Sequence, residues 1–232
     1  MEGMYLKQMS HPRPGRLTRG LLAGGVGLLA VASVAWPQPS GAAAAPNPVK
    51  GKVIFTKTCV ACHGEKAQGK RDLNSPALHT QEPWYLAAQL QKFRSGLRGV
   101  DPKDAGGLVM RPMALSLPDE QAVLDVAAYV SSIEGPPATP EVKGDAQAGA
   151  ATFIKVCAAC HGDGARGRPD LKTPALVGQN DWYVVLQLQK FKQGLRGADL
   201  KDATGAQMRA MALTLTSDVA MKDVAAYIAR LK

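Results

Sequence analysis

The chain has 232 residues, which exceeds a typical domain of about 100 to 150 residues, and only 5% of them are aromatic. Its formal net charge is +9, or about +6 without the charged residues of the first 45 positions. Lysines and arginines are scattered among acidic residues and form no basic stripe with interleaved aromatics, which argues against nucleic-acid binding. We therefore expect two compact units whose cores hold few aromatic rings.

Residues 1–45 have the order of an export segment. Basic residues precede an apolar run at 21–36, and the small residues "SGAAAA" follow at 40–45. This order is typical of a secretory signal peptide. The alternative is an N-terminal membrane anchor, because about 16 apolar residues fall just short of the roughly 20 that span a bilayer. Either way, the rest of the chain is expected in the periplasm, free or tethered to the outer face of the cytoplasmic membrane.

The chain repeats itself at an offset of 98 residues, with no gap between the matching positions. Roughly half of the paired positions are identical, so the two halves are predicted to share one fold. A segment rich in proline and glycine separates them and indicates an extended, rather stiff linker. We expect a first domain at 46–135, the linker at 136–146 and a second domain at 147–232.

Each half is predicted to consist of helices joined by long loops. A short helix should run into the first cysteine pair, with Phe55 on its buried side. The next helix is indicated by Pro83 near its first turn and Gly96 after its last turn. A third helix is expected within 116–133, with Ser116 as its N-cap. No segment shows the sustained alternation of a strand, so the predicted fold class is all-α.

All four cysteines lie in two copies of C-x-x-C-H, the attachment signature of c-type haem. Two thiols at this spacing reach the same side of a helical turn, and the next residue, His63 or His161, is placed to ligate the iron. Covalent haem also fills the core of units that are too small to bury enough apolar surface alone. The predicted attachment residues are Cys59, Cys62, Cys157 and Cys160.

Two other uses of paired cysteines are less consistent with the sequence. A disulfide or thioredoxin-like redox pair belongs to a strand-helix-strand context that is missing here. A single zinc site normally has its cysteine pairs about 15 to 20 residues apart, whereas these pairs lie in separate copies of a repeat. Two complete motifs behind an export signal therefore favour two haem c groups.

The second axial ligand of each iron is predicted to be a methionine. Both halves have two candidates at the same distance after the histidine, Met110 or Met113 and Met208 or Met211, in a segment expected to be a loop. Ligation by histidine and methionine closes the iron to small molecules and suits electron transfer. By contrast, His79 has no counterpart in the second half and is interpreted as a loop histidine.

Several residues near the motifs have two interpretations. The carbonyl groups of Pro76 and Pro174 would accept a hydrogen bond from the ligating histidines, or these prolines simply form turns. Four aromatic residues are interpreted mainly as core, with polar tips that could alternatively reach the haem propionates, namely Trp84, Tyr85, Trp182 and Tyr183. Four arginines are either solvated or partners of the haem propionates, namely Arg98, Arg111, Arg196 and Arg209.

With these motifs the chain resembles the dihaem c-type cytochromes of the cytochrome c4 family. The resemblance rests on two "CxxCHG" motifs, "PAL" followed by a glutamine, the "QLQKF" and "DVAAY" segments and the "MRxMA" segment. It implies two class I cytochrome c domains packed about a pseudo-twofold axis with their haem edges facing. It also implies that the first methionine of each pair, Met110 and Met208, is the ligand.

The resemblance implies an electron carrier of the periplasm rather than an enzyme. Its partners would be redox proteins such as a quinol-oxidising complex and a terminal oxidase, with membrane association only through the N-terminal segment. One alternative is a fixed haem subunit of a dehydrogenase or oxidase assembly. Another is a dihaem peroxidase-like enzyme, which needs an open iron and acid-base groups beside it. The near-identical ligand segments of the two halves argue against the enzyme.

Overall fold

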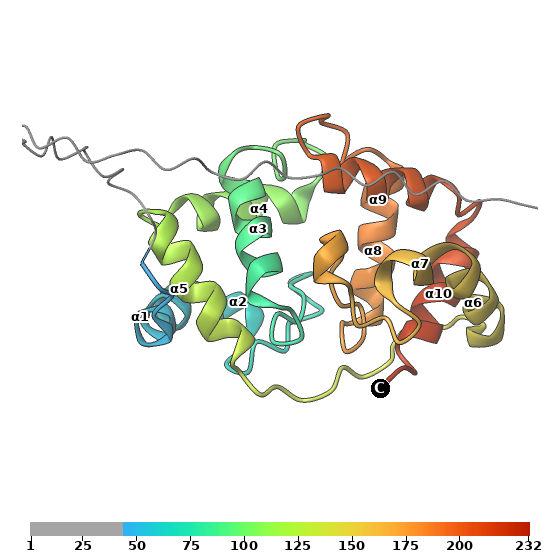
Figure 1. Cartoon of the computed structure of the whole chain (residues 1–232), viewed down its shortest axis with the longest axis horizontal. Helices are drawn as coiled ribbons and strands as arrows, with labels where there is room; N and C mark the ends of the chain where they lie inside the picture. The colour runs from blue at the N-terminus through green and yellow to red at the C-terminus, as the bar shows by residue number, and fades with distance from the viewer. Residues whose placement is uncertain (1–43) are drawn as a thin grey trace, which may run out of the picture. The chain divides into compact units, whose positions relative to one another are not determined.

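The computed structural model describes residues 44–232 (Figure 1). The predicted export segment at 1–45 lies almost wholly outside the described residues. The described part forms two helical lobes joined by a linker without regular structure. The helices of the first lobe are α1 (Pro48–Ile54), η1 (Phe55–Cys59), α2 (Val60–His63), α3 (Pro83–Arg94), α4 (Ala105–Leu115) and α5 (Glu120–Ser131).

The second lobe repeats this order of elements. Its helices are α6 (Ala146–Thr152), η2 (Phe153–Cys157), α7 (Ala158–His161), η3 (Pro169–Leu171), α8 (Asp181–Lys192), α9 (Ala203–Leu213) and α10 (Asp218–Ile228). Within 44–232 the only extended pairings are two isolated bridges, one in the same loop of each lobe. The predicted all-α fold is therefore confirmed. In this part of the chain no helix has the length and apolar character needed to cross a membrane.

Each lobe has its own hydrophobic core, built where its first and last helices cross. Phe55 and Phe153 are 2% and 0% exposed, as expected for the helix that precedes each cysteine pair. The crossing is close because a glycine faces the last helix. A Cβ atom at Gly51 would lie 2.0 Å from the carbonyl oxygen of Asp125, and the equivalent distance at Gly149 is 1.9 Å. Only glycine fits at such a contact.

Two predicted details of the helices need correction. Helix α5 is capped by Asp119, whose side chain accepts a hydrogen bond from the backbone N–H of Ala122 at 2.7 Å, and not by Ser116. The Ser116 hydroxyl instead donates to the carbonyl of Met113 at 2.7 Å and so ends the preceding helix. The methionine segments are helices α4 and α9 rather than loops. Each of these helices begins at an aspartate N-cap that the sequence interpretation did not recognise.

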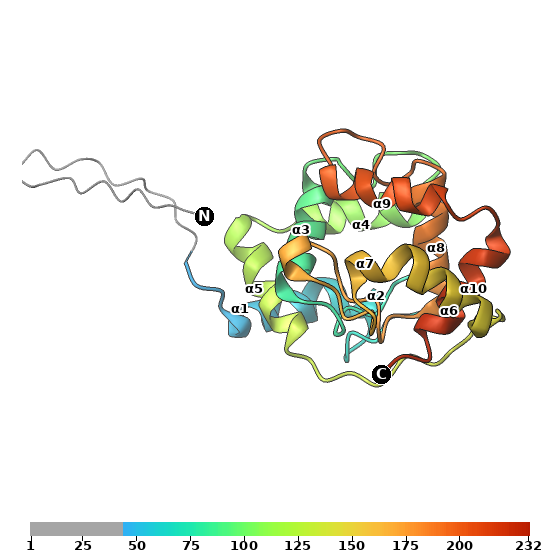
Figure 2. The same cartoon turned by 45° about the vertical axis from the view of Figure 1, so that its right-hand side comes forward.

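The lobes contact each other through reciprocal pairs. Gln81 donates to the carbonyl of Ala175 at 3.1 Å, and Gln179 donates to the carbonyl of Ala77 at 2.9 Å. Both pairs are related by the offset of 98, so the two lobes offer each other the same surface, as twofold-related partners do. Figure 1 shows α3 and α8 between α1 and α5 on one side and α6 and α10 on the other, and α1 with α5 and α6 with α10 keep opposite sides in the turned view of Figure 2.

Candidate haem sites

Each C-x-x-C-H motif ends a continuous helical segment that begins in the core. A π-helical turn, η1 or η2, leads from the buried phenylalanine to the first cysteine, and the rest of the motif forms one further α-helical turn. Single π-helical turns are rare and often occur at functional sites. Gly64, at φ +81°, ends the first segment directly after His63. Both cysteines and the histidine are thus held on one short, anchored helix.

The two motif histidines are buried and oriented alike. His63 and His161 are 7% and 6% exposed. The Nδ1 atom of His63 lies 3.0 Å from the carbonyl oxygen of Pro76, and that of His161 lies 2.9 Å from that of Pro174. Because a carbonyl oxygen only accepts, Nδ1 carries the proton and Nε2 keeps its lone pair. This tautomer leaves Nε2 available as a metal ligand.

Burial also keeps these imidazoles uncharged. It lowers the pKa of His63 and of His161, although the hydrogen bond to the proline carbonyl acts in the opposite direction. A neutral ring is the form that binds a metal ion, since the protonated ring has no free lone pair. Geometry and ionisation therefore agree on two equivalent ligand positions.

The four cysteines lie as two separate pairs, one in each lobe, and none forms a disulfide. Burial raises the pKa of Cys59 and of Cys157 to about 11, with a smaller contribution from the neighbouring cysteine. These thiols are therefore protonated at neutral pH. Within 44–232 no three histidine, cysteine or acidic side chains are arranged to hold a metal ion. The disulfide and zinc interpretations thus gain no support from the described residues.

The candidate methionines differ in exposure. Met113 and Met211 are 38% and 37% exposed, whereas Met110 and Met208 are only partly exposed. Met208 also packs against the hydrophobic core of the second lobe. The first methionine of each pair is therefore the more enclosed one.

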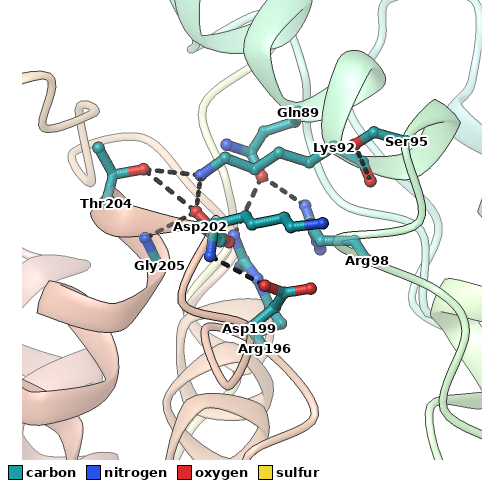
Figure 3. Close-up of polar contacts among 10 residues, drawn as sticks. Gln89, Lys92, Ser95, Arg98, Arg196, Asp199, Asp202, Thr204 and Gly205 are labelled. Atoms are coloured by element: carbon teal, nitrogen blue, oxygen red, sulfur yellow. Dashed lines mark hydrogen bonds and ion pairs between the residues drawn. The ribbon is translucent and has the colours of Figure 1, made fainter.

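A cluster of arginines and glutamines lies between the lobes (Figure 3). Arg98 donates to Gln89 at 2.7 Å and Arg196 donates to Gln187 at 2.6 Å. Each arginine also reaches the other lobe's glutamine, at 3.5 and 3.1 Å. Arg98 and Arg196 are 5% and 6% exposed, which excludes the solvated alternative for these two. Burial, followed by the charge of Arg196, lowers the pKa of Arg98.

This cluster fits the acidic edge of a haem. Two cations buried together are unfavourable unless an anion lies close to them. The Nε atom of Arg98 is buried without a hydrogen-bond partner among the described residues, and so are those of Arg111 and Arg209. Haem propionates are anions with several acceptor oxygens. They would neutralise the buried arginine charges and accept hydrogen bonds from the unpaired Nε–H groups. The donor set of the motifs and the unpaired arginine nitrogens therefore both fit haem c.

Two further candidates, His79 and Trp182, have contacts that involve no motif residue. His79 occupies a turn, as predicted, with Nδ1 3.1 Å from the carbonyl oxygen of Ala67. Trp182 is 5% exposed, and the Arg71 guanidinium lies 5.1 Å from the centre of its ring. Both border a cleft of about 360 Å³ beside the linker that contains no motif residue, and its wall also includes Asn74, Glu141, Lys143 and Lys222.

Sequence reasoning missed four charged residues at the lobe interface. They form two ion pairs between lobes, Lys92 with Asp202 and Lys190 with Asp104. The signal was present in the repeat, since both lysines and both aspartates recur at the offset of 98. Lys92 and Asp104 thus have identical counterparts in the second copy, as the cysteines and histidines of the motifs do.

Comparison with known proteins agrees with this geometry. A family model described as cytochrome c matches residues 48–134 and again residues 146–232. A cytochrome c4 from Thiocapsa roseopersicina is 32% identical, over 68% of this chain and 82% of that protein. The crystal structure of reduced cytochrome c4 from Pseudomonas stutzeri superposes with a TM-score of 0.65 at 28% identity, covering 81% of this chain and all of that chain.

The chain belongs to the dihaem cytochrome c4 family. It has two tandem cytochrome c domains, which imply two covalently bound haem c groups. A thiosulfate dehydrogenase electron acceptor from Stutzerimonas stutzeri is 30% identical over 77% of this cytochrome and 85% of that protein. A cbb3-type cytochrome c oxidase subunit from Bradyrhizobium is 33% identical over 55% of this cytochrome, which matches only 44% of that subunit.

Proposed function

We propose that this cytochrome carries electrons in the periplasm between components of a respiratory chain, and that it is not an enzyme. A quinol-oxidising complex is the proposed donor and a terminal oxidase the proposed acceptor. The surplus of basic residues supports weak, salt-sensitive docking on an acidic partner surface. We propose domains at 46–135 and 147–232 with the linker at 136–146, and an N-terminal segment at 1–45 that directs export.

Haem c supplies one-electron chemistry at its iron when it is bound. We propose that the cysteines of each motif hold one haem through thioether bonds, Cys59 and Cys62 in the first lobe and Cys157 and Cys160 in the second. Each pair is free and lies on one short, continuous helical segment, which supports this assignment. Arg98 and Arg196 are proposed to bind propionates between the lobes, and their burial together with the unpaired Nε of Arg98 supports this.

The proposed iron ligands are one histidine and one methionine in each lobe. His63 and Met110 would ligate the first iron, and His161 and Met208 the second. The Pro76 and Pro174 carbonyls would hold the imidazole rings in orientation, as outer partners of ligating histidines usually do. Two protein ligands on each iron leave no position for a small substrate, which favours electron transfer over catalysis.

One observation carries the proposal. Both lobes contain the same buried histidine, with its Nδ1 proton bonded to a proline carbonyl at nearly the same distance, 3.0 and 2.9 Å. A dihaem enzyme would need one iron site that differs from the other and stays open to substrate. Two equivalent, enclosed sites are what a carrier with two electron-transfer centres needs.

Single methionine variants test the ligands and the function together. The ferric protein should show a methionine-to-iron charge-transfer band that falls by about half in Met110→Ala and in Met208→Ala, because each variant opens one of two equivalent sites. Met113→Ala and Met211→Ala are the matched controls and should keep the full band. A band that depends on the exposed methionines would refute the ligand assignment. A high-spin signal or peroxide turnover in the wild-type protein would refute the carrier.

A second candidate is a fixed subunit of a larger assembly. It is favoured by the similarity to a cbb3-type oxidase subunit that is more than twice as long as the matched segment. A thiosulfate dehydrogenase structure from Marichromatium purpuratum also matches 79% of this cytochrome but only 40% of its own chain, with a TM-score of 0.64. Purification from detergent-solubilised membranes separates the two candidates, because a free carrier is recovered without companion subunits.

A further inference from the structure

Two lysines cross the lobe interface in opposite directions. The Nζ atom of Lys92, on α3, lies 2.6 Å from Oδ1 of Asp202 in the second lobe (Figure 3). The Nζ atom of Lys190, on α8, lies 2.6 Å from Oδ1 of Asp104 in the first lobe. One lysine of each lobe therefore pairs with an aspartate of the other lobe.

Both aspartates are N-caps of the helices that carry the methionines. Asp104 accepts the backbone N–H of Gly107 at 3.0 Å and begins α4, on which Met110 lies. Asp202 accepts the backbone N–H of Gly205 at 2.9 Å and begins α9, on which Met208 lies. In each case the same oxygen, Oδ1, also contacts the lysine of the other lobe. One carboxylate thus ties a methionine helix to the opposite lobe.

The contact is tight and shielded from solvent. Asp104 is 0% exposed and Asp202 is 4% exposed, so neither carboxylate can replace its lysine with bulk water. The first turn of each helix also packs directly on the carboxylate. A Cβ atom at Gly107 would lie 2.2 Å from Oδ2 of Asp104, and one at Gly205 would lie 2.1 Å from Oδ2 of Asp202. A shift of the carboxylate therefore moves the start of the helix.

We propose that Lys92 and Lys190 are positioning residues that act across the interface: each holds the methionine helix of the opposite lobe in place for iron ligation. The inference rests on the proposed ligands Met110 and Met208. Docking of the two lobes then contributes to the strength of both iron–methionine bonds. A change at one lobe's lysine should appear at the other lobe's iron.

The two lysine–aspartate pairs, called clamps below, differ in the additional contacts of their aspartates. The Thr204 hydroxyl accepts from Lys92 at 2.7 Å and also donates to Oδ1 of Asp202 at 3.4 Å, a contact that stays when Lys92 is lost. The equivalent position in the first lobe is Gly106, which has no hydroxyl to donate to Asp104. Asp104 keeps one oxygen, Oδ2, without a partner among the described residues. The Lys190 clamp is therefore the less redundant one, and its loss should have the larger effect.

Nuclear magnetic resonance of the reduced, haem-loaded protein tests the proposal. Each ligated methionine gives its own strongly shifted methyl signal, assigned by the loss of one signal in Met110→Ala and of the other in Met208→Ala. Lys92→Gln should shift or broaden the Met208 signal and leave that of Met110 unchanged. Lys190→Gln should do the reverse, and more strongly.

A ligand-exchange measurement gives the size of the effect. Added imidazole displaces a bound methionine from ferric iron, so its apparent affinity reports how firmly the methionine helix is held. We expect a rise of about five- to tenfold at the opposite lobe's haem, the factor expected when a helix N-cap is weakened. Lys103→Gln and Lys201→Gln, exposed lysines at equivalent positions near the same caps, are the matched controls and should change nothing.

Charge-preserving variants keep the test valid if a glutamine variant folds poorly. Lys92→Arg and Lys190→Arg should fold and restore most of the methionine signals. Effects confined to the lysine's own lobe, or no effect at either haem, would overturn the proposal. A wild-type protein with no shifted methionine signals would instead contradict the proposed ligands, so the two failures are distinguishable.

Discussion

The buried pair between Lys190 and Asp104 predicts a large loss of stability when only one partner is neutralised. In Lys190→Gln the carboxylate of Asp104, which is 0% exposed, keeps only the backbone N–H of Gly107 as a hydrogen-bond donor. The lysine side chain itself is 11% exposed, so water screens the pair little. Removing one partner from such a pair leaves an uncompensated buried charge.

The expected cost follows from that burial. Breaking a buried pair costs about 3 to 5 kcal/mol, against about 0 to 1 kcal/mol for an exposed pair. We take the lower end, about 3 kcal/mol, because the lysine keeps some contact with solvent. In a protein of this size that loss corresponds to a fall of about 6 to 12 °C in the melting temperature.

Guanidinium unfolding of the haem-loaded protein, followed by circular dichroism, measures this cost in a double-mutant cycle. Lys190→Gln and Asp104→Asn should each destabilise, whereas the double variant should recover about half of the loss, because no unpaired charge remains. Lys201→Gln, at an exposed lysine, is the control. Additive losses in the double variant, or a Lys190→Gln loss no larger than that of the control, would refute the reasoning.

Two further predictions concern packing and pH. Gly149→Ala should destabilise the folded protein by about 1 to 3 kcal/mol, because its methyl group would lie 1.9 Å from the Asp223 carbonyl oxygen. Thermal melts measure this loss. Gly164→Ala is the control and should melt like the wild type, because the nearest neighbour of its methyl group lies at 3.7 Å. Burial alone would raise the pKa of Asp202, but hydrogen bonds from Lys92 and the Gly205 N–H, with the charge of Arg196, hold it below its usual value. The stability that Asp202→Asn removes should therefore be present at pH 6 and shrink below about pH 4, as the wild-type carboxylate is protonated. A pH-independent loss, or the same profile in the exposed control Asp199→Asn, would contradict this.

Local patterns predicted much of the architecture. The offset of 98 predicted two lobes of one fold, and the helix from Pro83 to just before Gly96 has the expected limits. These signals depend on residues close together along the chain, because caps, prolines and glycines act within one or two turns. The errors arose where two local signals competed. Ser116 lies before α5 but ends α4, since Asp119 is a better-placed acceptor for the N–H groups of the next helix.

The candidate sites divide in the same way. The proposed attachment cysteines and histidine ligands follow from motif spacing alone, because in each lobe they lie on one short helical segment. The choice between Met110 and Met113, by contrast, gained a physical criterion only from the fold, in which Met110 is partly buried and Met113 is 38% exposed. The burial of Arg98 could not be inferred from the sequence either, since the arginine is covered by the other lobe.

The amino-acid sequence by itself determined the duplicated helical lobes and the residues that can attach and face a haem, because periodicity, capping and motif spacing are local properties of the chain. Only the tertiary structure decided which charges of one lobe meet the helix caps of the other. Lys92 and Asp202 are 110 positions apart, and nothing in their neighbourhoods along the chain encodes a contact that exists only after both lobes have folded and docked.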